Sequence, residues 1–134
     1  MFAKLSRKLK LQGGGSSVRS FVHIRDVADG TLRVARQAVP PNVYHLSTNR
    51  YIAIRDLVAM ICKKVGVAFE DMVETADDRP GKDHAYFLDS TKARETLGWS
   101  DGIDLESGIG DTIGWVAANF DVLRNQPLNY VHKP

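Results

Sequence analysis

A polar loop at residues 77–86 carries the residue types best suited to binding a phosphate. It places Arg79 and Lys82 on either side of a Pro80-Gly81 turn, among several acidic side chains. A guanidinium makes paired, charge-assisted bonds to phosphate oxygens, and a second cation three residues away can complete a clamp on a pyrophosphate. Charge alone does not separate such a clamp from a solvated charged loop, so both interpretations stay open at this point.

Arg19 is a second candidate for a phosphate contact. It follows the Gly13-Gly14-Gly15 loop and stands at the start of a run rich in β-forming residues. A loop without side-chain bulk allows a phosphate to come close, where a guanidinium can bind it. Taken by itself, however, Arg19 is more simply interpreted as a surface arginine.

Other chemistry has little support in the sequence. Histidines stand at positions 23, 45, 84 and 132, and no two have metal-ligand spacing on one predicted element. Cys62 lies beside the apolar stripe of a predicted helix, which favours core filling over reactivity. The glycines at 108, 110 and 114 fall inside another predicted helix, so we interpret them as packing positions and not as a cofactor loop.

Length and composition are those of one soluble globular domain. The 134 residues are 43% hydrophobic and 25% charged, which argues against disorder. No apolar run approaches the length needed to cross a bilayer, so we expect no membrane partner. A single cysteine cannot form an internal disulfide, and a cytoplasmic location is the simplest expectation.

Positive charge is concentrated in the first part of the chain. Residues 1–36 hold eight Lys or Arg against two Asp, a net charge of +6 in a chain whose total is +2. Such asymmetry raises nucleic-acid binding as a hypothesis. The basic residues lack interleaved aromatic side chains for stacking on bases, so a solvated basic segment is favoured.

Alternating strand and helix patterns predict the elements that position these residues. Strands are expected over residues 18–24, 43–47 and 72–75. Helices are expected from an Asp26 N-cap to Ala38, from Ile54 to Val65 before Gly66, from a Ser90 cap to Gly98, and over residues 104–123. This order predicts an α/β fold with about four to five helices, whose few short strands make a thin sheet.

Four segments, in order, resemble motifs of the extended short-chain dehydrogenases. They are residues 19–28 (RSFVHIRDVA), 79–86 (RPGKDHAY), 89–99 (DSTKARETLGW) and 105–113 (LESGIGDTI). Each alone is moderate evidence, but four with the right order and spacing are strong. The resemblance is closest to nucleoside-diphosphate-glucose 4,6-dehydratases and related sugar-nucleotide epimerases.

This resemblance implies roles for five residues. Arg19 and Arg79 would contact the diphosphate of a sugar nucleotide. Lys82 and Tyr86 would lie at or near the nucleotide. The turn after residue 47 often offers an asparagine in this family, which here would be Asn49, with residue 50 as the alternative. Many thymidine-linked members have histidine where Lys82 stands, so the nucleotide base stays open.

The family's cofactor loop and its Tyr-x-x-x-Lys catalytic pair lie upstream of the matching segments, and no Tyr-x-x-x-Lys occurs in this sequence. In an intact enzyme of this family, NAD oxidises C4 of the hexose, a base removes the C5 proton and water leaves from C6. The resemblance therefore implies a fragment without catalytic residues, which does not bind NAD completely. Residues 1–125 would form the carboxyl-terminal, sugar-nucleotide-binding domain of a Rossmann-type enzyme, its sheet incomplete, and residues 126–134 an irregular tail.

Three functional hypotheses follow. The first is the substrate-binding part of an NAD-dependent nucleotide-sugar 4,6-dehydratase or epimerase, with a nucleoside-diphosphate sugar as ligand. The second is a non-catalytic module that self-associates into a homo-oligomer, with exchange of elements as one route. The third, which we regard as the weakest, is a nucleic-acid binder that uses the basic amino-terminal segment.

Overall fold

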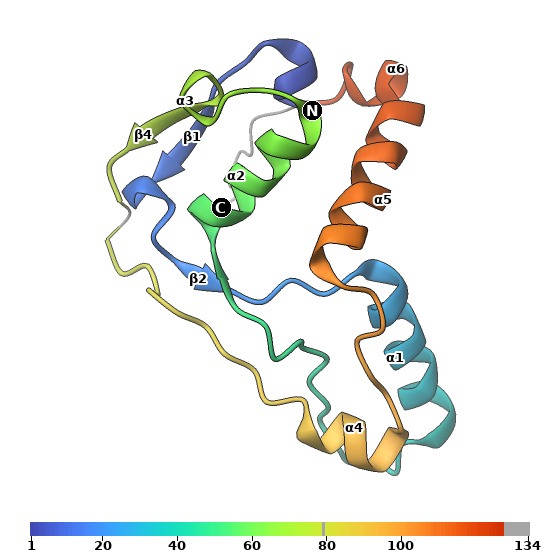
Figure 1. The fold of residues 1–134 in the computed structure, drawn as a ribbon. Helices are drawn as coiled ribbons and strands as arrows, with labels where there is room; N and C mark the ends of the chain where they lie inside the picture. Colours follow the sequence, from blue (N-terminus) through green and yellow to red (C-terminus); the bar gives the residue numbers. More distant parts are fainter. Residues whose placement is uncertain (79, 128–134) are drawn as a thin grey trace.

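The computed structural model describes residues 1–78 and 80–127 and shows short strands alternating with helices (Figure 1). With η for 3-10 helices, the elements in chain order are η1 (Ala3–Leu5), β1 (Leu9–Gln12), η2 (Gly13–Gly15), β2 (Val18–Arg19), α1 (Ile24–Gln37), β3 (Ile52–Ala53), α2 (Ile54–Val65), α3 (Phe69–Met72), β4 (Val73–Ala76), α4 (Thr91–Leu97), α5 (Leu105–Ala118) and α6 (Phe120–Leu123). The predicted α/β class is confirmed. The described residues form six α-helices, more than expected, because two are only four residues long.

The strands form two separate pairs. β1 pairs with β4 in parallel, with Leu9 opposite Val73. β2 pairs with β3 in the antiparallel sense, with Arg19 opposite Ile52. Two-stranded sheets are marginal alone and depend on packing against helices. The thin, incomplete sheet expected from the sequence is therefore confirmed for the described residues.

Two hydrophobic clusters hold the elements together. One joins the β1–β4 pair to α2, and the other joins α4 to α1, at the opposite end of the molecule (Figure 1). Their buried members are Leu11, Val58 and Cys62 in the first and Ala93, Leu97 and Trp99 in the second. The Trp99 indole N–H donates to the carbonyl of Asp26 at 2.8 Å, so the second cluster also ties the segment after α4 to α1.

Helix α2 agrees with the predicted helix at both ends. It spans Ile54–Val65, and Gly66 follows with the positive φ of 73° that closes a helix. Strand β4 begins one residue later than expected, at Val73. Both elements carry their apolar residues in a local repeat, which is why the sequence was sufficient to locate them.

Three predicted elements were wrong in detail. Helix α1 is capped by His23, whose Nδ1 accepts from the Arg25 N–H, because the Asp26 carboxylate is taken by the Ile103 N–H instead. Residues 43–47 pair with no strand among the described residues. The helix expected over 104–123 breaks at Asn119, whose backbone and side-chain amides both donate to the carbonyl of Trp115.

The strand expected over residues 18–24 is also shorter than predicted, since only Val18 and Arg19 are paired. None of the helices described is both long and apolar enough to cross a membrane. Within the expected tail, residues 128–134 lie outside the described residues, as does Arg79 of the 77–86 loop.

Candidate functional site

The Arg19 side chain lies against the backbone of the 80–86 loop. Its guanidinium donates to the carbonyl of Asp83 at 2.8 Å and to that of His84 at 3.4 Å, and also to the carbonyl of Val18 at 2.7 Å. Arg19 and Asp83 are 64 residues apart in the sequence. The structure therefore brings together the two regions that the sequence singled out separately.

Backbone contacts reinforce this junction. The Val18 N–H donates to the carbonyl of His84 at 2.8 Å, and Val18 forms a parallel β-bridge with Ala85. On the other side of β2, β3 continues directly into α2. Arg19 is thus carried by a short strand flanked on both sides, and its backbone is fixed although the strand has only two residues.

The Lys82 ammonium is bound to other groups of the protein and is not free to contact a phosphate. Its ammonium donates to the Asp78 carboxylate at 2.7 Å and to the carbonyl of Gln12 at 3.3 Å, at the end of β1. The Lys82 side chain is only 14% exposed. In this arrangement the Lys82 charge is already paired, so a nucleotide role for Lys82 stays a prediction that requires exchange of partners.

Tyr86 and Asn49 are both accessible. Tyr86 is 54% exposed and directly follows the residue that bridges to β2. Asn49 is exposed on the turn after the buried pair Ser47 and Thr48. The Arg50 N–H donates to the Thr48 hydroxyl at 3.2 Å, which closes this turn around Asn49.

Sequence reasoning missed an aromatic pair beside these residues. Tyr51 and Phe87 meet edge to face, with ring centroids 4.5 Å apart, and both rings are exposed. A cavity of about 250 Å³ also lies here, lined by Thr48, residues 50–52, Phe21 and the segment 101–105. Exposed aromatic residues at separate places in the sequence carry no local pattern, so only the fold reveals their proximity.

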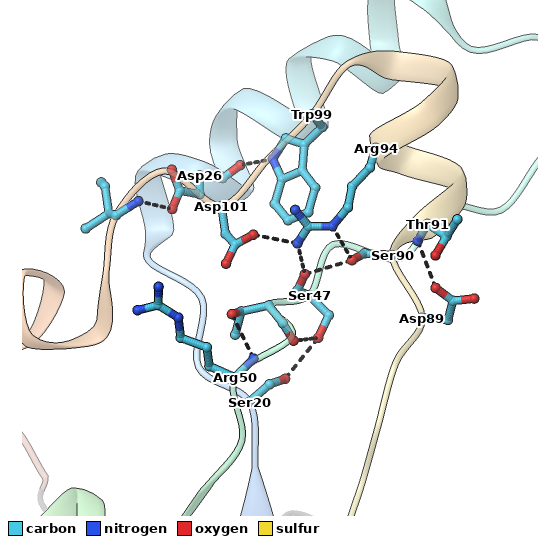
Figure 2. A network of polar contacts seen from close by, with 12 residues as sticks. Ser20, Asp26, Ser47, Arg50, Asp89, Ser90, Thr91, Arg94, Trp99 and Asp101 are labelled. Atoms are coloured by element: carbon cyan, nitrogen blue, oxygen red, sulfur yellow. Dashed lines mark hydrogen bonds and ion pairs between the residues drawn. The ribbon is translucent and has the colours of Figure 1, made fainter.

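A polar network connects Ser47, just before the turn at residues 48–50, to α4 (Figure 2). The carbonyl of Ser47 accepts from the Ser90 hydroxyl at 2.9 Å and from the Arg94 guanidinium at 3.0 Å. Arg94 also forms an ion pair with Asp101. Ser90 stands at the N-cap position of α4, as the sequence predicted, but its hydroxyl donates to Ser47 and makes no capping bond to the helix. The sequence predicted no partner for Arg94.

The Asp101 carboxyl has a lowered pKa. Partial burial by itself raises the pKa, but hydrogen bonds from Arg94 and Thr48 and the nearby positive charge outweigh burial. Asp101 is therefore charged at neutral pH. Burial and the neighbouring Glu70 raise the pKa of the Cys62 thiol, which agrees with a core-filling and unreactive cysteine.

The described residues offer little for a metal or a dinucleotide. No group of three or more potential metal ligands occurs among residues 1–78 and 80–127. Gly13–Gly15 form a 3-10 turn that leads into β2, whereas a dinucleotide loop opens a helix. Of the α5 glycines, Gly108 packs on His23, but Gly110 and Gly114 have open space around them, so packing explains only the first.

Much of the basic charge of the amino-terminal segment is used within the protein. Arg33 pairs with Asp29, and Arg25 pairs with Asp111. Arg7 lies over the ring of Phe2. These contacts spread the charge over several elements and do not add support to the nucleic-acid hypothesis.

Comparison with known proteins identifies the family of this chain. The model of the GDP-mannose 4,6 dehydratase family matches residues 2–112. The dTDP-glucose 4,6-dehydratase of Streptomyces antibioticus is 33% identical over 130 residues, which are 95% of this chain and 38% of that enzyme.

Two solved structures of Rossmann-type enzymes agree with this match. The dTDP-glucose 4,6-dehydratase DesIV of Streptomyces venezuelae, with NAD bound, has a TM-score of 0.85 at 26% identity, covering 90% of this chain and 37% of that chain. The Bordetella bronchiseptica enzyme WbmF, in complex with NAD+ and UDP, has a TM-score of 0.74 at 29% identity, covering 92% and 36%.

The fold is thus that of one part of an extended short-chain dehydrogenase. The chain belongs to the GDP-mannose 4,6 dehydratase family, which confirms the predicted resemblance to sugar-nucleotide dehydratases. It spans little more than a third of the length of these relatives.

Proposed function

We propose that this chain forms the nucleoside-diphosphate-binding part of an NAD-dependent nucleotide-sugar 4,6-dehydratase or epimerase. The observation that carries the proposal is the Arg19 guanidinium, held in place by the carbonyls of Asp83 and His84. A guanidinium fixed in this way is already ordered before a ligand binds. Its remaining N–H groups can therefore bind a phosphate without the entropy cost of ordering the side chain. The UDP in the related WbmF complex supports the ligand class.

Four other residues are proposed to contact the same ligand. Arg79 would contact the diphosphate together with Arg19. Asn49 and Tyr86 would offer polar groups to the nucleotide from the two exposed segments beside β2 and β3. Lys82 would join them by leaving Asp78. The proposal assigns binding and orientation of the nucleotide to this chain, and assigns hydride transfer to the NAD-binding part of an enzyme of this family.

Titration calorimetry of this chain with UDP, dTDP, CDP and GDP tests the proposal. We expect at least one diphosphate to bind, and Arg19→Lys to weaken binding about 10- to 100-fold, since the planar fork is lost although the charge remains. Arg36→Lys is the matched control, because Arg36 is an exposed residue near the end of α1. Absence of binding by all four diphosphates, or equal binding by Arg19→Lys, would contradict the proposal.

A second candidate function, self-association, is favoured by an apolar groove. The groove has a volume of about 880 Å³ and runs between α2 and α5. Leu57 and Ile61 line it from α2, and Ile109, Ile113 and Val116 line it from α5. Open apolar surfaces of this kind are typical of interfaces. Sedimentation at several concentrations tests this candidate, and a strict monomer would exclude it.

A further inference from the structure

The carbonyl of Ser47 is the meeting point of two side chains from α4 and its N-terminal cap. The Ser90 hydroxyl donates to this carbonyl at 2.9 Å, and the Arg94 guanidinium donates to it at 3.0 Å. Ser47 is 2% exposed and Ser90 is 1% exposed. Residues 43–47 lack strand partners within the described chain, so side chains supply the hydrogen bonds that a sheet would otherwise provide.

Arg94 is the centre of this network (Figure 2). Its Nε donates to the Ser90 hydroxyl at 3.0 Å, and the Nη2 that binds Ser47 also binds the Asp101 carboxylate. The guanidinium lies over the Trp99 ring, 5.2 Å from the centroid. With three polar partners and an aromatic face, the Arg94 side chain has one well-defined position.

Two chains of contacts connect Arg94 and Asp101 to the candidate site. The Ser47 hydroxyl, 3.0 Å from that of Ser20, connects Arg94 to the residue after Arg19. Asp101 and Thr48 line the same cavity, and the Thr48 side chain helps to lower the pKa of the Asp101 carboxyl. The Thr48 hydroxyl in turn accepts the Arg50 N–H and so closes the turn at residues 48–50 that carries Asn49.

We propose that Arg94 and Asp101 are positioning residues for the nucleotide site, which hold the 47–50 turn and the end of β2 in the geometry that binding requires. The inference rests on the proposed function, because it concerns Asn49 and Arg19 as substrate contacts. Neither Arg94 nor Asp101 touches the nucleotide in this proposal. They act through Ser47, Thr48 and Ser20.

Arg33 provides a matched control, because its guanidinium also has three polar partners and also contacts α4. Its guanidinium donates to the carbonyls of Leu97 and Gly98, both at 3.0 Å, and pairs with Asp29. Arg33 therefore ties α1 to the C-terminal end of α4, whereas Arg94 ties the same helix to Ser47. A variant of Arg33 reports what general loosening of α4 does without disturbing the 47–50 turn.

The experiment compares Arg94→Lys, Asp101→Asn and Arg33→Lys by amide hydrogen exchange and by calorimetry with UDP and dTDP. Exchange reports the local opening of each amide. We expect the Arg50 amide to exchange at least about 10-fold faster in the first two variants. The Val67 amide, bonded to the carbonyl of Cys62 in the other cluster, serves as the internal reference. We also expect diphosphate affinity to fall about 10-fold in these variants and to stay within about 2-fold in Arg33→Lys.

Two outcomes would overturn the inference. One is unchanged exchange at Arg50 in Arg94→Lys and Asp101→Asn. The other is equal acceleration at Arg50 and Val67, or the same acceleration in Arg33→Lys, because that pattern means general destabilisation. If the unmodified chain binds no diphosphate, the proposed function fails, and the inference fails with it as a statement about a nucleotide site. The exchange data still decide whether Arg94 and Asp101 hold the turn.

Discussion

Asp101 is held in its charged form by groups from two other segments. Partial burial opposes the charge, but hydrogen bonds from Arg94 and the Thr48 hydroxyl outweigh it and lower the pKa of the carboxyl. The Asp101 side chain is 22% exposed, so solvent screens this interaction less than it screens a surface ion pair. Folding therefore stabilises the carboxylate form relative to the carboxylic acid.

This linkage predicts how stability depends on pH. The folded pKa of Asp101 lies below its unfolded value of about 3.9, so its contribution is present above that pH and is lost as the pH falls towards the folded pKa. We expect Asp101→Asn to lower the free energy of unfolding by about 1–2 kcal/mol at pH 7. The difference should shrink once the pH falls below the unfolded pKa of about 3.9.

Urea unfolding at a series of pH values measures this difference. Asp89 and Asp104 also have lowered pKa values, through hydrogen bonds from Thr91 and Ser107 respectively. Both remain in the variant, so their effect on acid stability cancels in the comparison. A difference between the two proteins that does not change with pH would show that the Asp101 charge is irrelevant to stability.

Among the elements, the turn η2 decides where β1 ends and β2 begins. All three of its glycines have positive φ, and Gly15, with φ of 74°, lies against the start of α2. A Cβ atom at Gly15 would come within 2.9 Å of the Arg55 backbone nitrogen. The turn therefore requires glycine here for its backbone conformation and for its close approach to α2.

Substitution of Gly15 by alanine should destabilise the protein by about 2 kcal/mol, because backbone strain and a backbone contact add together. Gly110→Ala is the matched comparison, since Gly110 lies inside α5 with nothing within 4 Å of a Cβ atom. Alanine there should stabilise the helix by about 1 kcal/mol. Thermal and urea unfolding measure both effects, and a Gly15→Ala protein as stable as the parent would refute the role given to η2.

For the whole molecule, the two hydrophobic clusters lie at opposite ends, and the apolar groove lies between α2 and α5. Helix α5 is apolar on more than one side, since Ile113 lines the groove while Trp115 is 59% exposed elsewhere. Helices that are apolar all round are normally buried. This imbalance is the physical basis for expecting a second polypeptide surface against α5.

If copies of this chain associate through the groove, a charge placed inside it should prevent association. We expect Ile113→Glu to shift the protein towards monomer by at least about 10-fold in the dissociation constant, because the carboxylate would lose its hydration on burial. Leu32→Glu, on the exposed side of α1, is the control and should have no effect. Equal association of Ile113→Glu and the parent would remove the groove as the interface.

The sequence alone was sufficient where the determining interaction is local. The apolar repeat and Gly66 located α2, and four ordered motifs indicated the family that the comparisons confirmed. The sequence also indicated a loop at the glycines 13–15 and a family motif that ends at Trp99. For α2, neighbours along the chain decide the conformation, so pattern and structure agree.

Only the tertiary structure decided the features whose partners are remote. Asp26 was predicted as an N-cap, but its carboxylate meets the Ile103 N–H, 77 residues away. The meeting of Arg19 with Asp83, the pairing of Lys82 with Asp78, and the Arg94–Asp101–Ser47 network depend on how β2, α4 and the loops pack. No periodicity records such contacts, because they result from burial and hydrogen-bond satisfaction across the whole fold.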